Sequence, residues 1–298
     1  MLESTSKKLL LNALAPSTRQ AYTRALNTYE QFCRMYNFNA DLPITIYKLS
    51  LFITFQYEKG LPASSILSCM SAISYFHKLI SAKVDPTKSF VINQLMTGIK
   101  KDRPSLDLRK PMSLNIIHLL IDNIHKLELS NFENHLFKAL FLFAFYFGLR
   151  IGEFTSSPHN LSLNQITVNE HEISLKFASY KHAPLELSPV SHKLKADQSA
   201  YCPVKLLRNY LSLRGNDNGP IFLLNTKSLT AKYFSLRFKQ ALIMCNLNPS
   251  LYAGHSFRIG AACYWASLGL SHIQIRRLGR WQSDAFLKYI RDDVNHPQ

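Results

Sequence analysis

A short basic segment containing two prolines interrupts the chain at residues 100–112, which read KKDRPSLDLRKPM. Five of its side chains are basic, and few are apolar enough for a core to bury. Segments of this composition usually connect domains rather than form part of one. We therefore expect two domains, residues 1–100 and 113–298, joined by a basic linker at residues 101–112. That linker either lies along a phosphate backbone or is a solvated hinge.

The first hundred residues carry apolar side chains at helical spacing, and proline or glycine punctuates them. Pro16 opens one helix, and Gly60-Leu61-Pro62 breaks the chain after the second. This pattern predicts one small helical domain, with helices at residues 16–36, 41–58, 63–80 and 85–101.

The second part of the chain mixes two periodicities. Residues 173–178 alternate apolar and polar side chains, and residues 185–187 alternate again, which predicts a β-hairpin. A further short strand is expected at residues 219–223. The fold class is therefore α+β, mainly helical with a small sheet. The helices of this part are predicted at residues 113–127, 134–147, 204–213, 229–244, 255–268, 271–280 and 283–293.

The charge of the chain points to a polyanionic partner. Lys and Arg number 35 against 19 Asp and Glu, a formal net charge of +16, while 47% of residues are hydrophobic. The apolar content excludes a disordered chain. Nucleic acid is the leading partner on charge alone, ahead of a basic surface used only for solubility and of a membrane surface.

Several classes of protein are disfavoured by what the sequence lacks. The five cysteines are widely spaced without a CxxC pair, which argues against a disulfide scaffold or a cysteine zinc site and favours a reducing compartment. The N-terminal run LLLNALA is short for a secretory signal, and Ala139–Leu149 is too short to cross a bilayer. We expect a soluble intracellular protein with no membrane partner.

Catalytic signals of the common kinds are also lacking. No P-loop, nucleophile elbow, HExxH motif or carboxylate cluster is present, so we expect no metal and no cofactor. Cationic side chains in the second domain offer another way to act on a phosphodiester. Arg150 follows Gly148 at a helix boundary, and His255 and Arg258 share one helix face, where both can reach one ligand.

The order of these elements resembles the tyrosine recombinase (phage-integrase-type) family. GLRIGEF, a hairpin carrying lysine, HSFR, GRW and a tyrosine near the C-terminus follow one another along the whole chain. The resemblance implies a SAM-like helical core-binding domain followed by a catalytic domain. The tail LGRWQSDAFLKYIR is most similar in wording to recombinases of eukaryotic mobile elements, such as cryptons and DIRS-type elements.

The resemblance implies that two arginines clamp the scissile phosphate. Arg150 and Arg258 match these positions, and a guanidinium suits them because it stays charged and binds phosphate oxygens bidentately. Glu153, near Arg150, matches an acidic residue that supports the site. His255 matches the residue that orients the phosphate and assists proton transfer.

The remaining matched residues would carry bond breakage and formation. Tyr289 matches the nucleophile, whose attack would form a 3′-phosphotyrosyl bond that a 5′ hydroxyl reverses. Lys181 matches the hairpin lysine that protonates the leaving 5′ oxygen, and Lys176 competes with it for this role. Trp281 matches a position whose ring N–H bonds a phosphate oxygen. It lies eight residues before Tyr289, one fewer than is common, and Arg280 precedes it, so the local helix must adjust.

The resemblance also implies a double-stranded DNA partner and a homo-tetramer on two DNA sites, with a dimer on each. A type IB topoisomerase-like enzyme, or a recombinase-derived DNA-binding protein that no longer cuts, are the alternatives. A eukaryotic mobile element would place the protein in the nucleus. The candidate DNA-binding residues of the first domain and linker are Thr18, Arg19, Ser65, Lys100, Lys101, Arg103, Arg109 and Lys110.

Overall fold

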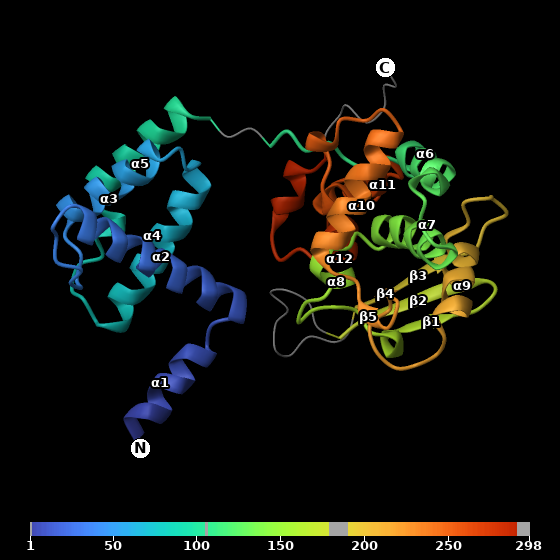
Figure 1. The fold of residues 1–298 in the computed structure, drawn as a ribbon, viewed down its shortest axis with the longest axis horizontal. Helices are drawn as coiled ribbons and strands as arrows, with labels where there is room; N and C mark the ends of the chain where they lie inside the picture. The colour runs from blue at the N-terminus through green and yellow to red at the C-terminus, as the bar shows by residue number, and fades with distance from the viewer. Residues whose placement is uncertain (1, 105–106, 179–189, 291–298) are drawn as a thin grey trace. The chain divides into compact units, whose positions relative to one another are not determined.

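A computed structural model describes residues 2–104, 107–178 and 190–290 of the chain. The chain divides into two compact units, residues 1–107 and 108–298. The described residues are mainly helical with small antiparallel sheets in the second unit, which confirms the predicted α+β class (Figure 1).

Helices make up the secondary structure described in the first unit. The structure has one α-helix before the four that were predicted, and its described side chains are exposed, so no buried apolar stripe marks it in the sequence. The core lies between the later helices, where the rings of Phe32 and Phe52 are 5.4 Å apart. The helices are α1 (Leu2–Asn12), α2 (Pro16–Met35), α3 (Ile46–Glu58), α4 (Ala63–Leu79) and α5 (Phe90–Asp102), with the 3₁₀ turn η1 (Pro86–Lys88).

The second unit is built around α7, whose side chains are buried on most faces. A capping box starts this helix, because Ser130 and Glu133 each accept a hydrogen bond from the other's backbone N–H. Helix α11 packs against it. The helices of this unit are α6 (Leu114–Asn123), η2 (Ile124–Leu127), α7 (Asn131–Tyr146), α8 (Ile151–Phe154), η3 (Leu163–Gln165), α9 (Pro203–Arg214), α10 (Ala231–Met244), η4 (Pro249–Leu251), α11 (Gly254–Ser267), α12 (His272–Gly279) and η5 (Asp284–Lys288).

A three-stranded antiparallel sheet of order β1-β2-β3 covers part of this core. Its strands are β1 (Ile166–Val168), β2 (Glu172–Phe177) and β3 (Val190–Lys195), and a second pair joins β4 (Leu223–Leu224) to β5 (Lys227–Ser228). Strand β2 follows the predicted alternation, with Ile173, Leu175 and Phe177 buried. The predicted strand at residues 185–187 lies outside the described residues. The prediction at 219–223 was wrong in extent, since pairing there is limited to one bridge at Pro220 and the start of β4.

The C-terminal helix predicted at residues 283–293 is also wrong. The described chain forms only the 3₁₀ turn η5, and Tyr289 follows it with its N–H donating to the carbonyl of Phe286 at 2.8 Å. The thiol of Cys263 on α11 donates to the Tyr289 carbonyl at 2.9 Å, so this carbonyl is engaged by a side chain. Tyr289 is therefore held at the end of a short turn against α11.

Candidate active site

Arg150 is the N-cap of α8, at the turn from α7, and Glu153 lies within α8. Gly148 has a φ of +52°, and a Cβ atom there would lie 2.7 Å from the Trp265 ring, so this turn depends on glycine. The Arg150 backbone N–H donates to Glu153 Oε2 at 2.9 Å, and its guanidinium donates to Oε1 at 3.1 Å. The Glu153 side chain is 2% exposed and that of Arg150 is 23% exposed. A buried carboxylate thus holds a guanidinium that solvent can reach.

A second guanidinium, that of Arg280, completes the surroundings of Glu153. Its Nη2 donates to Glu153 Oε2 at 2.8 Å, and its Nη1 donates to the carbonyls of Phe147 at 3.1 Å and Leu278 at 3.2 Å. The guanidinium carbon lies 3.7 Å from the ring centroid of Phe177 on β2. Sequence reasoning gave Arg280 no role in the site, because its contacts with Phe147, Glu153 and Phe177 join positions more than a hundred residues apart.

Arg258 lies on α11, one turn after His255, and its side chain is enclosed. Only 1% of the residue is exposed, and its Nη1 donates to the carbonyl of Gly148 at 2.6 Å while its Nη2 donates to that of Gly279. Burial and the nearby charges of Arg150 and Arg280 hold its pKa well below the usual range. Its guanidinium lies over the Trp281 ring, 4.2 Å from the centroid.

Three rings meet beside this arginine. The His255 imidazole and the Tyr289 phenol are edge to face with centroids 5.2 Å apart, and Trp281 lies 6.0 Å from Tyr289. The chain turns sharply at Arg280, whose φ is +55°, so that Trp281 faces Arg258 and Tyr289. The short interval between Trp281 and Tyr289 contains the 3₁₀ turn η5.

The charge of Glu153 is set by opposing effects. Burial alone would raise its pKa, but the charges of Arg280, Arg150 and Arg258, with the hydrogen bond from the Arg150 backbone, hold the pKa below its usual value. Glu153 is therefore ionised at neutral pH. Three guanidinium groups surround one carboxylate, which leaves an excess of positive charge where a phosphate could bind.

His192 on β3 is a further buried polar residue near this cluster. Its ring lies 5.3 Å from Phe177 and 6.3 Å from Phe147. Burial, reinforced by the charges of Arg280 and Arg277, lowers the pKa of His192 to about 3. The side chain is therefore a neutral member of the core at physiological pH.

Comparisons with known proteins show what the chain as a whole is similar to. No protein-family model matches the chain. It is 24% identical over 301 residues to the integrase/recombinase xerD homolog of Selenomonas ruminantium, an alignment that covers 97% of this chain and 85% of the relative. A structure of the Tn1549 transposon integrase with transposon right end DNA matches with a TM-score of 0.67 at 12% identity, covering 93% of this chain and 90% of that one.

Two further structures match nearly as well. The XerH site-specific recombinase bound to palindromic difH substrate has a TM-score of 0.65 at 16% identity, covering 91% of this chain and 75% of that one. A lambda integrase dimer bound to a COC′ core site has a TM-score of 0.65 at 15% identity. This match covers 100% of this chain and 78% of that one. The chain has the tyrosine recombinase fold. Its similarity to the xerD homolog supports the tyrosine recombinase and integrase family as well.

In this tyrosine recombinase fold, the candidate lysines are placed differently from the other site residues. Lys181 lies outside the described residues. Lys176 lies on β2 with an exposed side chain, next to the buried Phe177 that contacts Arg280. Since neighbouring side chains on a strand point to opposite faces, Lys176 points away from the face that contacts the arginine cluster.

The residues proposed for DNA contact by the first unit and the linker are spread over several elements. Thr18 and Arg19 lie in the first turn of α2 and Ser65 lies near the start of α4, all partly exposed. Within the predicted linker, α5 continues through Asp102, and the Lys110 backbone N–H donates to the Leu251 carbonyl of the second unit at 2.7 Å.

The basic residues at the two ends of this connection differ in their contacts. Lys100 and Lys101 are exposed in the last turn of α5. The guanidinium of Arg103 is 3.8 Å from the Tyr57 ring centroid and donates to the Tyr57 carbonyl at 2.7 Å. Arg109 is partly exposed. Part of this positive charge is thus presented to solvent, and part is packed on the first unit.

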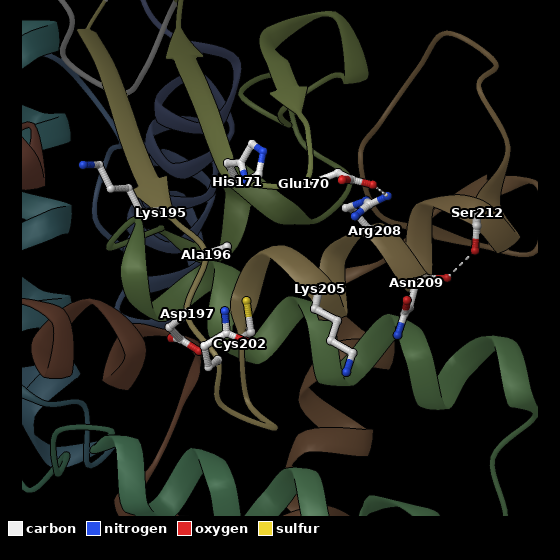
Figure 2. Close-up of a pocket in the computed structure, with 11 residues that line it drawn as sticks. Glu170, His171, Lys195, Ala196, Asp197, Cys202, Lys205, Arg208, Asn209 and Ser212 are labelled. Atoms are coloured by element: carbon white, nitrogen blue, oxygen red, sulfur yellow. Dashed lines mark hydrogen bonds and ion pairs between the residues drawn. The ribbon is translucent and has the colours of Figure 1, made fainter.

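A separate hollow of about 820 Å³ lies beside α9 and the end of β3 (Figure 2). Its wall includes the ion pair between Arg208 and Glu170, 3.2 Å apart, and none of the predicted site residues. Within the described ranges, no three His, Cys, Asp or Glu side chains are grouped as a metal site would require. No described helix is both long and apolar enough to cross a membrane.

Proposed function

We propose that this protein is a site-specific recombinase or integrase that cuts and rejoins DNA through a 3′-phosphotyrosyl intermediate. The observation that carries the proposal is the convergence of Tyr289, His255 and Trp281 on the buried Arg258. Arg150 reaches the same region from the α7–α8 turn. Six residues were predicted to be catalytic, and these five lie in the described part of the chain; the sixth, Lys181, does not.

The chemistry begins with attack of the Tyr289 hydroxyl oxygen on the scissile phosphorus. The P–O5′ bond breaks as the tyrosyl P–O bond forms, and the leaving 5′ oxygen takes a proton from Lys181. His255 orients the phosphate and assists removal of the phenolic proton. Attack by a 5′ hydroxyl on the phosphotyrosine reverses these steps and releases Tyr289. The phosphotyrosyl bond conserves the energy of the broken phosphodiester, so the exchange needs no external energy source.

Arg150 and Arg258 stabilise the charge that develops on the phosphate oxygens. Arg150 is partly exposed and has N–H groups that Glu153 does not occupy. Arg258 is buried beneath Trp281, with two of its five N–H groups donated to carbonyls. The remaining N–H groups of Arg258 and the indole N–H of Trp281 are the donors that we propose for the oxygens of the scissile phosphate.

We further propose double-stranded DNA as the partner, with a dimer on each site and a homo-tetramer joining two sites. The net charge of +16 supports sequence-independent contact with the backbone. The wording of the tail, LGRWQSDAFLKYIR, favours a mobile element as the source, and a eukaryotic element would place the protein in the nucleus. The mass of the complex on one site and on two sites, measured in solution, tests this stoichiometry.

The decisive experiment is trapping of the covalent adduct. A duplex selected for binding from a random library is given a nick beside the cleavage position, so that the released fragment diffuses away and cleavage cannot reverse. Wild-type protein should form a covalent adduct, and Tyr289→Phe should form none while binding the same duplex. Tyr201→Phe is the matched control, because its hydroxyl bonds Asp122 at 2.7 Å outside the site.

The products of this experiment also separate the alternative functions. Strand exchange between two duplexes supports a recombinase, whereas relaxation of supercoils without exchange identifies a topoisomerase-like enzyme. Tight binding with no adduct from the wild-type protein identifies a DNA-binding protein that does not cut. An adduct that persists in Tyr289→Phe would show that another residue is the nucleophile.

A further inference from the structure

We propose that Arg280 is a positioning residue that locks the segment carrying Arg150 to the segment carrying Trp281 and Tyr289. This inference rests on the proposed function and adds a residue to the six catalytic positions. Arg280 touches neither DNA nor the reacting atoms in this proposal. It acts through Glu153, which in turn holds Arg150.

The first argument is connectivity. The Arg280 guanidinium donates to the carbonyls of Phe147 at 3.1 Å and Gly148 at 3.4 Å, and to Glu153 Oε2 at 2.8 Å. These acceptors lie at the end of α7, in the turn that follows and on α8, more than 120 residues earlier in the chain. The next residue after Arg280 is Trp281. One side chain therefore joins the two stretches of chain from which the candidate site is assembled.

The second argument is burial. The side chains of Arg280 and Glu153 are 0% and 2% exposed. Water cannot replace Arg280 at such depth, so its loss would leave Glu153 with Arg150 as its remaining ion-pair partner described here and would remove a buried donor from the Phe147 carbonyl. The two segments consequently have one favourable arrangement rather than a range of them.

The third argument is backbone conformation. Arg280 has a φ of +55°, a left-handed conformation that is unfavourable for a non-glycine residue, and the buried contacts of its guanidinium stabilise it. The Trp281 backbone N–H donates to the Arg276 carbonyl at 3.0 Å and closes the end of α12. This left-handed turn directs the indole of Trp281 over Arg258, 4.2 Å from the ring centroid.

The fourth argument is electrostatic. Glu153 alone would compete with a phosphate for Arg150, since the carboxylate and the phosphate are both anionic acceptors for the same guanidinium. The guanidinium of Arg280, which is paired with Glu153 Oε2 in the protein interior, offsets part of the negative charge of Glu153. Arg150 is then held in place by the carboxylate while its partly exposed edge remains positive toward a substrate.

The experiment compares Arg280→Met with Arg214→Met. Arg214 is the matched control, because its guanidinium also donates to backbone carbonyls of the second unit, at 2.7 Å to Pro220 and 2.9 Å to Asp217, and contacts none of the candidate site residues. Each variant is measured for its melting temperature, for affinity toward the duplex used with the wild type, and for the single-turnover rate of covalent adduct formation per folded molecule.

We expect Arg280→Met to form the adduct on the order of 10²-fold more slowly, with DNA affinity within about threefold of wild type, because small displacements of catalytic groups are this costly. Arg214→Met should lose thermal stability but retain the wild-type rate per folded molecule. A wild-type rate in Arg280→Met, or an equal fall in rate in both variants, would overturn the positioning role.

Arg280→Lys provides a second measurement if the methionine variant does not fold. A lysine keeps the charge beside Glu153 but cannot reach all the carbonyls, so the rate should fall about 10-fold at unchanged affinity, whereas a wild-type rate overturns the inference. A wild-type protein that forms no adduct refutes the proposed function itself, and the inference with it. A wild-type adduct together with unaffected Arg280 variants refutes the inference alone.

Discussion

The imidazole of His255 meets the phenol of Tyr289 edge to face, with ring centroids 5.2 Å apart. His255 lies in the first turn of α11, and Tyr289 is reached through the turn after η5. This contact places an imidazole, a group that can accept a proton, beside the proposed nucleophile.

Replacement of His255 by phenylalanine should therefore slow cleavage while leaving DNA binding intact. The phenyl ring keeps the edge-to-face packing on Tyr289 but cannot take or give a proton, and general acid–base catalysis contributes about 10²–10⁴-fold. Single-turnover adduct formation measures the loss. A neighbouring histidine outside the site, His272, provides the control, and His272→Phe should cleave at the wild-type rate.

The role of Lys181 can be separated from that of Lys176 by changing the leaving group. A lysine that protonates the 5′ oxygen is no longer needed when that oxygen is replaced by sulfur, which departs readily as a thiolate. We predict that Lys181→Ala is slow on ordinary DNA and recovers on the sulfur-containing substrate. Lys176→Ala should be near wild type on both. Recovery of Lys176→Ala instead would assign the role to Lys176.

His192 should make the second unit sensitive to acid. Its folded pKa of about 3 lies below the unfolded value near 6.5, so the unfolded state binds the extra proton between these values. The contribution to stability is complete above pH 6.5 and falls by up to about 1.4 kcal/mol for each pH unit below it. Denaturant titrations from pH 7 to pH 4 measure this slope. His192→Leu should flatten it, and an unchanged slope in this variant would assign the acid sensitivity to other groups.

Gly279 leaves no room for a side chain beside Trp281. A Cβ at this position would lie 1.4 Å from the indole ring, so Gly279→Ala must displace Trp281 from its place over Arg258. We expect a loss of at least ~2 kcal/mol in stability or a visible change in tryptophan fluorescence, with slower cleavage. In Gly98→Ala, where nothing lies within 4 Å of the new Cβ, stability of the first unit should rise by about 0.5–1 kcal/mol. Equal behaviour of both variants would contradict this packing.

Salt should weaken DNA binding strongly. If six or more cations contact phosphates, affinity falls about 10³-fold or more between 50 and 200 mM salt. Replacing Lys100 and Lys101 together by alanine should reduce the slope of log affinity against log salt by roughly two. Lys193→Ala is the control, because Lys193 pairs with Glu172 at 2.8 Å on the sheet. A flat salt response would argue against a backbone-contacting role for these charges.

The relative placement of two site residues could be predicted from the sequence only where they are close together along the chain. His255 and Arg258 lie one helical turn apart, so a short sequence fixes their common face. The order of the motifs along the chain then indicated which distant arginine and tyrosine complete the set. The contact between Arg280 and Glu153 joins positions 127 residues apart, and no local period encodes it.

Two segments of secondary structure were predicted incorrectly for a similar reason. Strand β3 reads VSHKLK, and its buried residue is His192, so a polar side chain interrupts the apolar alternation of Val190 and Leu194. Where a helix was expected after Ser283, the described residues form the 3₁₀ turn η5, and the Tyr289 carbonyl accepts from the Cys263 thiol of α11. Tertiary contacts decided both segments, and a single sequence does not contain them.

The carbonyl oxygen of Gly148 accepts hydrogen bonds from both Arg258, at 2.6 Å, and Arg280, at 3.4 Å. This acceptor belongs to the main chain, so no codon change can delete it and an alanine scan cannot measure its contribution directly. Only a change of atom, such as a backbone ester or thioamide introduced by chemical synthesis, would reveal its energetic weight. Functional residues are usually recognised from their side chains. A main-chain acceptor such as this one is not detected in that way, because no mutation removes it.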